Sequence, residues 1–353
     1  MGSINIDNTG SGADVTISSD GTDLLLDGTA IGGGGGSPDL YADNYDGSST
    51  KPSATGTNGV AIGRSASATS SDAFAFGFGA IATHGQSLAL GTSRAFAGDA
   101  VAIHIDNNST SYGASGANSI AIGYRAKAST SGGIAIGYLA VADGGGTGIA
   151  LGDNARAGNN AISIGQDGWA GGQTYAQGQG SIAIGQNCLA TQTASVVVGM
   201  HAYSNIIGKY VYSNGTWGQG TAQTGTFTLL HSTTDATPIV LTTNKSTASS
   251  NNQIILPNNS AYAFHGTIVA RQQASGGTAC AAWKIEGLIR REANAGTTTL
   301  VNSATTVLDN TPSWGMALSA DTTNGGLKIE VTGAASTNIR WIATINTSEL
   351  TYA

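Results

Sequence analysis

One short motif, repeated along residues 60–202, constrains the fold of this chain more than any other feature. A small residue, usually Ala, is followed by a bulky apolar residue and then by Gly. Successive motif glycines are mostly 13, 14 or 15 residues apart, and two intervals are longer. The ten copies are Ala61-Ile62-Gly63, Ala75-Phe76-Gly77, Ala89-Leu90-Gly91, Ala102-Ile103-His104, Ala121-Ile122-Gly123, Ala135-Ile136-Gly137, Ala150-Leu151-Gly152, Ser163-Ile164-Gly165, Ala183-Ile184-Gly185 and Val197-Val198-Gly199. A fixed period of this kind indicates a repeat architecture.

The length of the repeat selects the kind of architecture. Helical repeats need roughly 33 to 47 residues, whereas about 14 residues suffice for two short strands and two turns of a parallel β-solenoid. The alternation in 119–122 and 181–184 is typical of a strand with one buried face. We expect the motif glycine to end this strand with a positive φ. A second strand is predicted where Ala alternates with polar residues, as in 64–68.

Each coil contains few large apolar side chains. One or two such side chains contribute about 1.5–3 kcal/mol each when buried, whereas ordering each residue of the coil costs about 1–2 kcal/mol. A single column of coils is therefore predicted to need further packing, and the chain is expected to be an obligate oligomer.

The repeats resemble the head repeats of trimeric autotransporter adhesins, which also occur in phage tail fibres. Both have Ser-x-Ala-Ile-Gly followed by an Ala-rich second strand, and the match covers 60–202. The resemblance implies a left-handed parallel β-roll in which three chains pack about one axis. It places these residues in the shared trimer core: Ile62, Ile122, Ile136, Ile164 and Ile184.

Composition supports an extended β protein. Only 10% of the 353 residues are charged, 53 are Gly, and none of the five Pro lies in 60–202, where Pro would remove hydrogen bonds between strands. The net charge of −7 comes from residues 1–59, which hold eight Asp and one Lys. No basic patch suggests a nucleic-acid partner.

The segments before the repeat are predicted to have separate roles. Residues 1–35 contain three short apolar runs separated by turn residues, which favours a small β element that docks on a larger particle or intertwines in the trimer. Residues 36–59 are expected to be a Gly/Asp-rich linker. The first residues lack the basic and apolar regions of a secretory signal, so synthesis and assembly in a cytoplasm are expected.

The repeat is predicted to end at 202 and to be followed by a neck at 203–225. Residues 226–353 show eight or nine strand signals with turn residues between them and no helical pattern. These features predict an antiparallel β-sandwich of jelly-roll type. The runs 261–271, 281–291, 320–329 and 339–345 resemble the C-terminal domain of phage and prophage tail-fibre proteins. The whole chain is thus expected to be all-β.

Candidate receptor contacts are exposed aromatic residues in loops. Trp169 and Tyr175 lie in one of the longer intervals of the repeat, and the segment 309–314 places Asp309 and Asn310 close to Trp314. Such aromatic side chains could stack on sugar rings. The alternatives are that the first two cover a neighbouring coil or a trimer seam, and that Trp314 fills the interior of the sandwich.

Catalytic residues, metal sites and cofactors are not predicted. The five His are scattered without metal-ligand spacing, and no Gly-x-Ser-x-Gly motif occurs. Of the four Glu, Glu286 lies between basic residues and Glu330 is in another strand segment. His104, which replaces a motif glycine, is interpreted as a turn variant or as an ion ligand on a trimer axis. The chain is therefore predicted not to be an enzyme.

The two resemblances together imply a function. They imply a homotrimeric phage tail fibre in the virion, joined to a tail or baseplate protein by its N-terminus. Its C-terminal domain would bind a host cell-surface receptor, either a polysaccharide or an outer-membrane component. The alternatives are a capsid decoration or head fibre, a bacterial trimeric surface adhesin, and a glycan-degrading spike.

Overall fold

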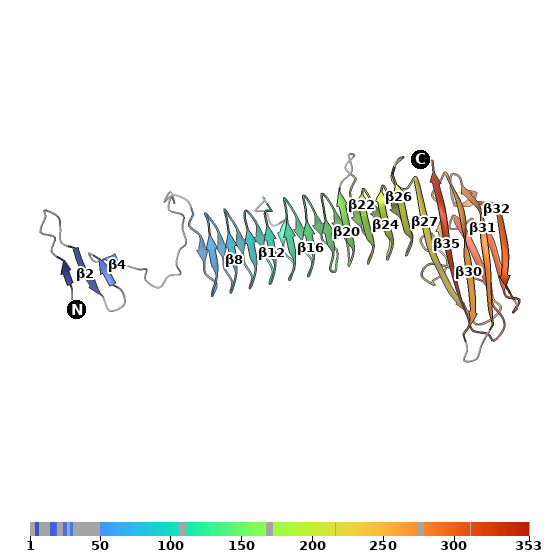
Figure 1. Cartoon of the computed structure of the whole chain (residues 1–353), viewed down its shortest axis with the longest axis horizontal. Helices are drawn as coiled ribbons and strands as arrows, with labels where there is room; N and C mark the ends of the chain where they lie inside the picture. The colour runs from blue at the N-terminus through green and yellow to red at the C-terminus, as the bar shows by residue number, and fades with distance from the viewer. Residues whose placement is uncertain are drawn as a thin grey trace.

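The structure is a computed structural model that describes residues 50–105, 111–166, 172–215, 217–273, 279–310 and 312–352. In the first 49 residues it describes only the backbone of four short antiparallel strands, namely β1 (Ile4–Ile6), β2 (Val15–Ser19), β3 (Leu24–Leu26) and β4 (Thr29–Ala30). The described chain is all-β, as predicted, and its one helical element is the 3-10 turn η1 (Ala295–Thr297). A long rod of stacked coils leads into a broader C-terminal domain (Figure 1).

Two parallel stacks of strands form the rod, which confirms the predicted parallel β-solenoid. The first stack is β6 (Val60–Ile62), β8 (Phe74–Phe76), β10 (Leu88–Leu90), β12 (Val101–Ile103), β14 (Ile120–Ile122), β16 (Ile134–Ile136), β18 (Ile149–Leu151), β20 (Ile162–Gln166), β22 (Ile182–Gln186), β24 (Val196–Met200) and β26 (Tyr210–Asn214). The second is β5 (Ser53–Ala54), β7 (Ser67–Ala68), β9 (Ile81–Ala82), β11 (Arg94–Ala95), β13 (Gly113–Ala114), β15 (Lys127–Ala128), β17 (Val141–Ala142), β19 (Arg156–Ala157), β21 (Tyr175–Ala176), β23 (Leu189–Ala190) and β25 (Tyr203–Ser204).

The interior of the rod is a column of small side chains. The second residue of each motif strand and the second residue of each facing strand point inward, as Ala121 and Ala128 do, and both of these alanines are fully buried. Neighbouring coils align these positions, so that Ala121 pairs with Ala135 and Ala128 with Ala142. Because a methyl group fills the space between the two sheets, the large apolar residues on either side of each inward Ala must point outward.

The rod departs from the prediction at three places. It begins at β5, within residues 36–59 that were expected to be a linker, because Ser53 and Ala54 pair with Ser67 and Ala68 of the next coil. The second strand of each coil has only two residues, because Ser65 and its equivalents turn the backbone at positive φ, +59° for Ser65. The stack also extends beyond residue 202, since β25 and β26 form another coil where a separate neck was expected. In that coil Ser204 and Val211 occupy the inward positions that Ala fills elsewhere.

The motif glycines have the positive φ expected of them, for example +107° at Gly63 and +124° at Gly185. His104 adopts φ +54° at the same place in its coil and is exposed, which agrees with a turn variant. A Cβ atom at Gly185 would also overlap the backbone carbonyl of Gly199 in the next coil. Conformation and space together therefore require glycine at this corner.

Replacing Gly185 by Ala is expected to lower the free energy of unfolding by about 1–3 kcal/mol, through backbone strain and displacement of the next coil. Thermal unfolding followed by circular dichroism measures the effect. Gly180→Ala is the matched control, because Gly180 also has positive φ (+64°) but no atom lies within 4 Å of an added Cβ. Equal destabilisation by the two changes would show that contact between coils does not matter at position 185.

The C-terminal domain continues one sheet of the rod. Strand β26 pairs with β27 (Ala222–Thr233), and the sheet then runs through β35 (Ile339–Thr351), β30 (Ser260–Gln272), β31 (Cys280–Arg291) and β32 (Thr299–Asp309). All of these pairings are antiparallel. Because no break separates the two regions of the sheet, the domain is joined to the rod through backbone hydrogen bonds.

A smaller sheet covers the inner face of this large sheet. It comprises β28 (Ile239–Val240), β29 (Ile254–Ile255), β33 (Gly315–Asp321) and β34 (Gly326–Thr332). The antiparallel sheet expected at the C-terminus is confirmed. The jelly-roll connection is not, because β30, β31 and β32 are consecutive in sequence and remain neighbours in one sheet.

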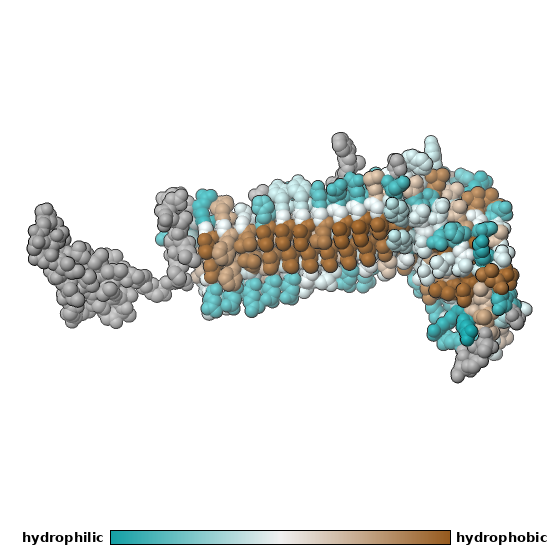
Figure 2. Space-filling model, in the orientation of Figure 1, coloured by the Kyte–Doolittle hydropathy of each residue, from teal (hydrophilic) through white to brown (hydrophobic). Residues whose placement is uncertain are grey.

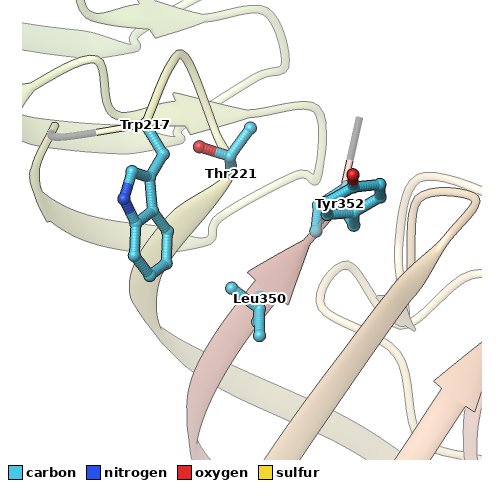
Figure 3. A pocket seen from close by; sticks show the side chains of 5 residues that line it. Trp217, Thr221, Leu350 and Tyr352 are labelled. Carbon is cyan, nitrogen blue, oxygen red and sulfur yellow. The ribbon is translucent and has the colours of Figure 1, made fainter.

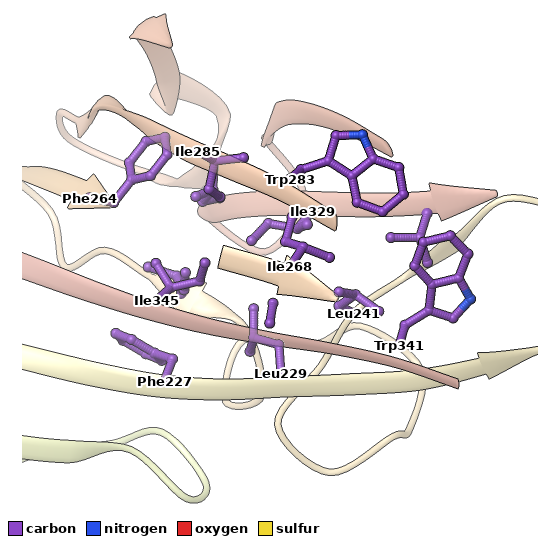
Figure 4. Close-up of a cluster of buried hydrophobic side chains, with 14 of the residues drawn as sticks. Phe227, Leu229, Leu241, Phe264, Ile268, Trp283, Ile285, Ile329, Trp341 and Ile345 are labelled. Carbon is purple, nitrogen blue, oxygen red and sulfur yellow. The ribbon is translucent and has the colours of Figure 1, made fainter. Parts of the chain in front are cut away.

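Apolar side chains between the two sheets form the core of the domain (Figure 4). Three tryptophans meet in this core: the ring of Trp341 stacks on Trp283 at 5.8 Å and lies 5.8 Å from the tilted ring of Trp314. The indole Nε1 of Trp341 donates a hydrogen bond of 3.0 Å to Oγ1 of Thr233. The only polar atom of this large buried side chain is thereby satisfied.

A buried ion pair lies where the rod meets the domain. Lys209, in the turn before β26, places its Nζ 2.6 Å from Oε2 of Glu349 in β35, and the two side chains are only 4% and 0% exposed. Gln223 Nε2 and Thr347 Oγ1 also donate to the Glu349 carboxylate, at 2.8 and 2.7 Å. Burial raises the pKa of Tyr262 well above its usual value, and the nearby Glu349 carboxylate adds to the increase.

Candidate functional site

A groove of about 520 Å³ lies in the C-terminal domain. The groove lies on strands β27, β35 and β30. It is beyond Thr226, which is the last residue of β27 that pairs with the rod. Its lining residues are Leu230, His231, Ser232, Lys245, Val269, Arg271, Arg340, Trp341 and Ile342. The site is therefore formed mainly by strands, which hold side chains more rigidly than loops do.

Apolar side chains form one row across the groove. Leu230 pairs with Ile342, and Ile342 pairs with Val269 on the next strand, so the three lie side by side on the outer face of the sheet. Ile342 is 48% exposed and Val269 is 45% exposed. A sheet face turned to water normally carries polar residues at such positions, so this row is a candidate contact surface.

Cationic side chains form the next row. Arg340 pairs directly with Arg271 and, on its other side, with Ser232. Both arginines are exposed. The two arginines thus place like charges at directly opposed positions of neighbouring strands.

Lys245 adds a third cation from the loop that follows the bridge between Leu230 and Thr242. The loop is held by its own hydrogen bonds: Asn244 Oδ1 accepts from the backbone of Ser246 at 3.2 Å and from the side chain of Asn252 at 3.0 Å. At the groove wall, the backbone N–H of Ser232 donates to Nδ1 of His231 at 2.9 Å. The groove is thus apolar along one row and basic along the next.

The structure does not bring the predicted receptor contacts together. Tyr175 lies in the rod, half-buried under the guanidinium of Arg156 at 4.9 Å, and Trp169 lies outside the described residues. Trp314 is only 3% exposed and packs in the core, which favours the alternative that it fills the sandwich. Asn310 holds it there by accepting from its backbone N–H at 2.8 Å and donating to its carbonyl at 2.7 Å.

Asp309 ends β32, is exposed, and pairs with Ala282 on the strand next to Val269. It lies on the same face of the sheet as the groove, so this one predicted residue is near the site. The groove residues themselves were missed by sequence reasoning. The sequence does contain a pattern that could have indicated them. An Arg and a large apolar residue stand two positions apart, and so on one face of a strand, in Val269 and Arg271 and again in Arg340 and Ile342.

A second hollow, of about 470 Å³, lies at the junction of rod and domain (Figure 3). Its lining residues are Trp217, Thr221, Leu350, Thr351 and Tyr352, and the side chains of Trp217, Leu350 and Tyr352 are exposed. It contains no charged side chain among the residues that the structure describes there. It therefore offers aromatic and apolar contact only.

The outward side chains of the motif strands form a continuous apolar stripe along the rod (Figure 2). The stripe comprises the first and third residue of each motif strand from Val60/Ile62 to Val196/Val198. The predicted trimer-core residues all belong to it; Ile136, Ile164 and Ile184 are 37–38% exposed, and Ile62 and Ile122 are half-buried. An exposed stripe of this length marks an interaction surface.

The described parts of the chain do not bring together the glutamates that the sequence offered for carboxylate chemistry, nor a cluster of metal ligands. No cluster of three His, Cys, Asp or Glu suited to a metal ion occurs there. Glu286 and Glu330 lie on different sheets, and each is beside a lysine, Lys284 at 4.0 Å and Lys328 at 3.4 Å. Cys188 and Cys280 are both free. No helix long and apolar enough to cross a bilayer is found among the described residues.

Comparison with known proteins supports the interpretation of the repeat. The YadA head domain repeat matches residues 54–80, 68–93, 114–140 and 171–202, which together are less than half of the chain. The rod therefore carries adhesin-like head repeats. No curated protein gives a match.

Three solved structures are similar in fold, and all are tailspike proteins of phages. The tailspike gp49 of Acinetobacter baumannii phage Fri1, a capsular polysaccharide depolymerase, shares 12% identity with a TM-score of 0.22, over 80% of this chain and 55% of that one. The tailspike of Acinetobacter phage vB_ApiP_P1 shares 8% identity with a TM-score of 0.22, over 86% and 81%. That of phage AM24 shares 8% identity with a TM-score of 0.19, over 82% and 55%. The chain thus spans about half the length of the Fri1 protein.

The prediction that this chain is not an enzyme is corrected by these comparisons. It rested on the scattered histidines and the few glutamates of the sequence. Because a capsular polysaccharide depolymerase is among the structures similar to this chain, the exclusion of enzymatic activity is withdrawn.

Proposed function

We propose that this protein is a homotrimeric tail fibre of a phage and that it attaches the virion to a glycan on the host cell surface. Three copies pack their apolar stripes about a common axis, with Ile62, Ile122, Ile136, Ile164 and Ile184 in the shared core. The N-terminal segment, residues 1–35, docks on a tail or baseplate protein. The C-terminal domain contacts the host.

The apolar stripe is the observation that supports a trimeric assembly. Its side chains are half-exposed in the single chain, while the interior of the rod holds little more than methyl groups. Packing of the stripe against other copies removes this apolar area from water and supplies the stabilisation that a thin coil lacks. A trimer also presents three receptor sites at one end, which raises avidity.

The continuous sheet supports the role of a fibre. Backbone pairing runs without interruption from β6 to β32, so the rod holds the C-terminal domain at a fixed orientation and distance. Along the rod the strand farthest from the coils is β32, and the groove lies on β27, β35 and β30, nearer to the rod (Figure 1). A head fibre or a bacterial surface adhesin would use the same rod, and these alternatives differ in where the N-terminal segment is attached.

Binding to cells tests the proposal. Fluorescently labelled protein is incubated with a panel of bacterial strains and with derivatives that lack capsule or other surface polysaccharide. We expect saturable binding to particular strains and its loss when the polysaccharide is absent. Binding that is unchanged without the polysaccharide, or no binding to any strain, contradicts the proposal. New reducing ends in the medium would identify the glycan-degrading alternative.

A further inference from the structure

The continuous sheet ends in a strand whose outer edge is unprotected. Among the described residues β32 pairs only with β31, and every residue of this 11-residue strand except Leu300 is exposed. Proteins commonly protect such an edge with charged residues, Pro, bulges or a short strand. Residues 299–308 contain no charged residue and no Pro. The two irregularities of β32 lie near its ends, and residues 302–307 between them pair with β31 in regular register.

The backbone groups of three residues point to the open edge. In an antiparallel sheet, successive residues bond alternately to the strand on one side and to the strand on the other. The N–H of Gln272 in β30 donates to the carbonyl of Ala279, just before β31, so the even-numbered residues of β31 bond to β32. Their partners in the regular stretch are also even-numbered. Ser303, Thr305 and Val307 therefore direct their N–H and C=O groups away from β31.

The inner face beside this edge is open as well. Thr305 and Val307 pair with Ile285 and Trp283, whose side chains are buried between the two sheets of the domain. Val307 itself is 57% exposed, so the smaller sheet does not extend over β32. A strand added at the edge would find space for its side chains and would cover Val307.

Packing of three copies through their stripes does not cover the edge. The stripe lies on a face of the sheet, whereas the free groups of β32 lie in the plane of the sheet and point away from the coils (Figure 1). Copies related by rotation about an axis along the rod hold their β32 strands at the same distance along that axis. No β32 of the trimer can therefore lie beyond another and pair with its edge.

The chemistry of the edge identifies the class of partner. A row of alternating N–H and C=O groups is complementary to the backbone of an extended polypeptide, and a sugar chain has no matching repeat. Because residues 299–308 are uncharged, they offer no ion pair to a charged residue on an added strand.

We propose that the free edge of β32 binds an extended, uncharged segment of a protein on the host cell surface, which adds to the sheet as a further strand. The inference goes beyond the proposed glycan contact, since it gives the fibre a second partner. It rests on the proposed function for the three-fold arrangement and for the orientation of the C-terminal domain toward the host.

The first test uses the full-length protein and a fluorescein-labelled peptide of about ten residues in which Thr and Val alternate, a composition that favours strands. Fluorescence anisotropy should show saturable binding, and Thr305→Pro should weaken it by at least about thirtyfold, because proline removes a free N–H and its ring obstructs the added strand. An edge strand tolerates proline where the N–H faces solvent, so the solution mass should not change.

Thr305→Ala is the matched control. It removes the side chain but keeps the backbone N–H, and we expect it to weaken peptide binding by less than about fivefold. A peptide with Pro at every second position should not bind the unaltered protein, a result that does not depend on how the Thr305→Pro variant folds. Absence of binding by the Thr/Val peptide, binding by the Pro peptide, or equal loss in the two variants would overturn the inference.

Cells separate this inference from the proposed function. In a strain that the fibre binds, brief protease treatment removes surface polypeptide and leaves polysaccharide. We expect the unaltered protein to dissociate severalfold faster from treated cells, and Thr305→Pro to show that faster rate on untreated cells. Equal rates on treated and untreated cells would refute the protein partner and leave glycan attachment standing. A solution mass of six chains that falls to three in Thr305→Pro would show that two fibres pair through β32, and the inference would be wrong.

Discussion

Replacement of Lys209 by Met is expected to lower the free energy of unfolding of the C-terminal domain by about 3–5 kcal/mol. The change removes the cation 2.6 Å from Glu349 and leaves a carboxylate with a fully buried side chain. The hydrogen bonds from Gln223 and Thr347 remain, but they do not neutralise the charge. Chemical denaturation followed by tryptophan fluorescence measures the effect, because Trp283, Trp314 and Trp341 lie in the core of this domain.

The matched control is Lys284→Met. Lys284 also faces a glutamate, Glu286, but at 4.0 Å and with both side chains more than half exposed, so its loss is expected to change the free energy of unfolding by less than about 1 kcal/mol. The double change Lys209→Met and Glu349→Gln should recover part of the lost stability, since no buried charge is then left alone. If Lys209→Met behaved like Lys284→Met, the buried ion pair would not contribute to the stability of the C-terminal domain.

Replacement of Ile164 by Asp is expected to dissociate the trimer. In the proposed assembly the change brings three carboxylates into the apolar core about the axis, where each unpaired charge costs several kcal/mol. A single chain would tolerate the change, because Ile164 is 38% exposed there. Size-exclusion chromatography with light scattering should show a fall from the mass of three chains to that of one.

Val141→Asp controls for the introduction of a charge into the rod. Val141 also points outward, but from the facing sheet, and it pairs with Lys127 on one side and Arg156 on the other. An Asp between two cations is expected to be tolerated, and the mass should remain that of a trimer. Dissociation by Val141→Asp but not by Ile164→Asp would place the contact between copies on the opposite face of the rod.

The sequence was sufficient to predict the rod because its constraints are local and periodic. Each motif glycine ends a strand at positive φ, and each inward Ala fits a space too narrow for a larger side chain, so spacing alone specifies the coil. The two-residue second strand was not foreseen, because Ser65 adopts positive φ without being glycine. The extra coil at Tyr210–Asn214 was also missed, since Tyr replaces the aliphatic residues of the motif there.

The groove could not be predicted from the sequence, because the residues that line it are far apart in the chain. Arg271 and Arg340 are 69 positions apart in numbering and become neighbours only because β35 inserts between β27 and β30. Alternation within either strand shows that these residues point outward, but not that they meet. Trp314 illustrates the opposite case: the sequence allowed either a receptor contact in a loop or a residue filling the sandwich, and the packing of Trp341 against it shows that it is part of the core.

The solution mass of the full-length chain shows whether three copies assemble. We expect a mass three times 35.1 kDa, measured by light scattering and independent of protein concentration over the range used, because the stripe is buried only in the assembly. A mass of 35.1 kDa would contradict it, since the apolar stripe would then be exposed to water in a stable single chain.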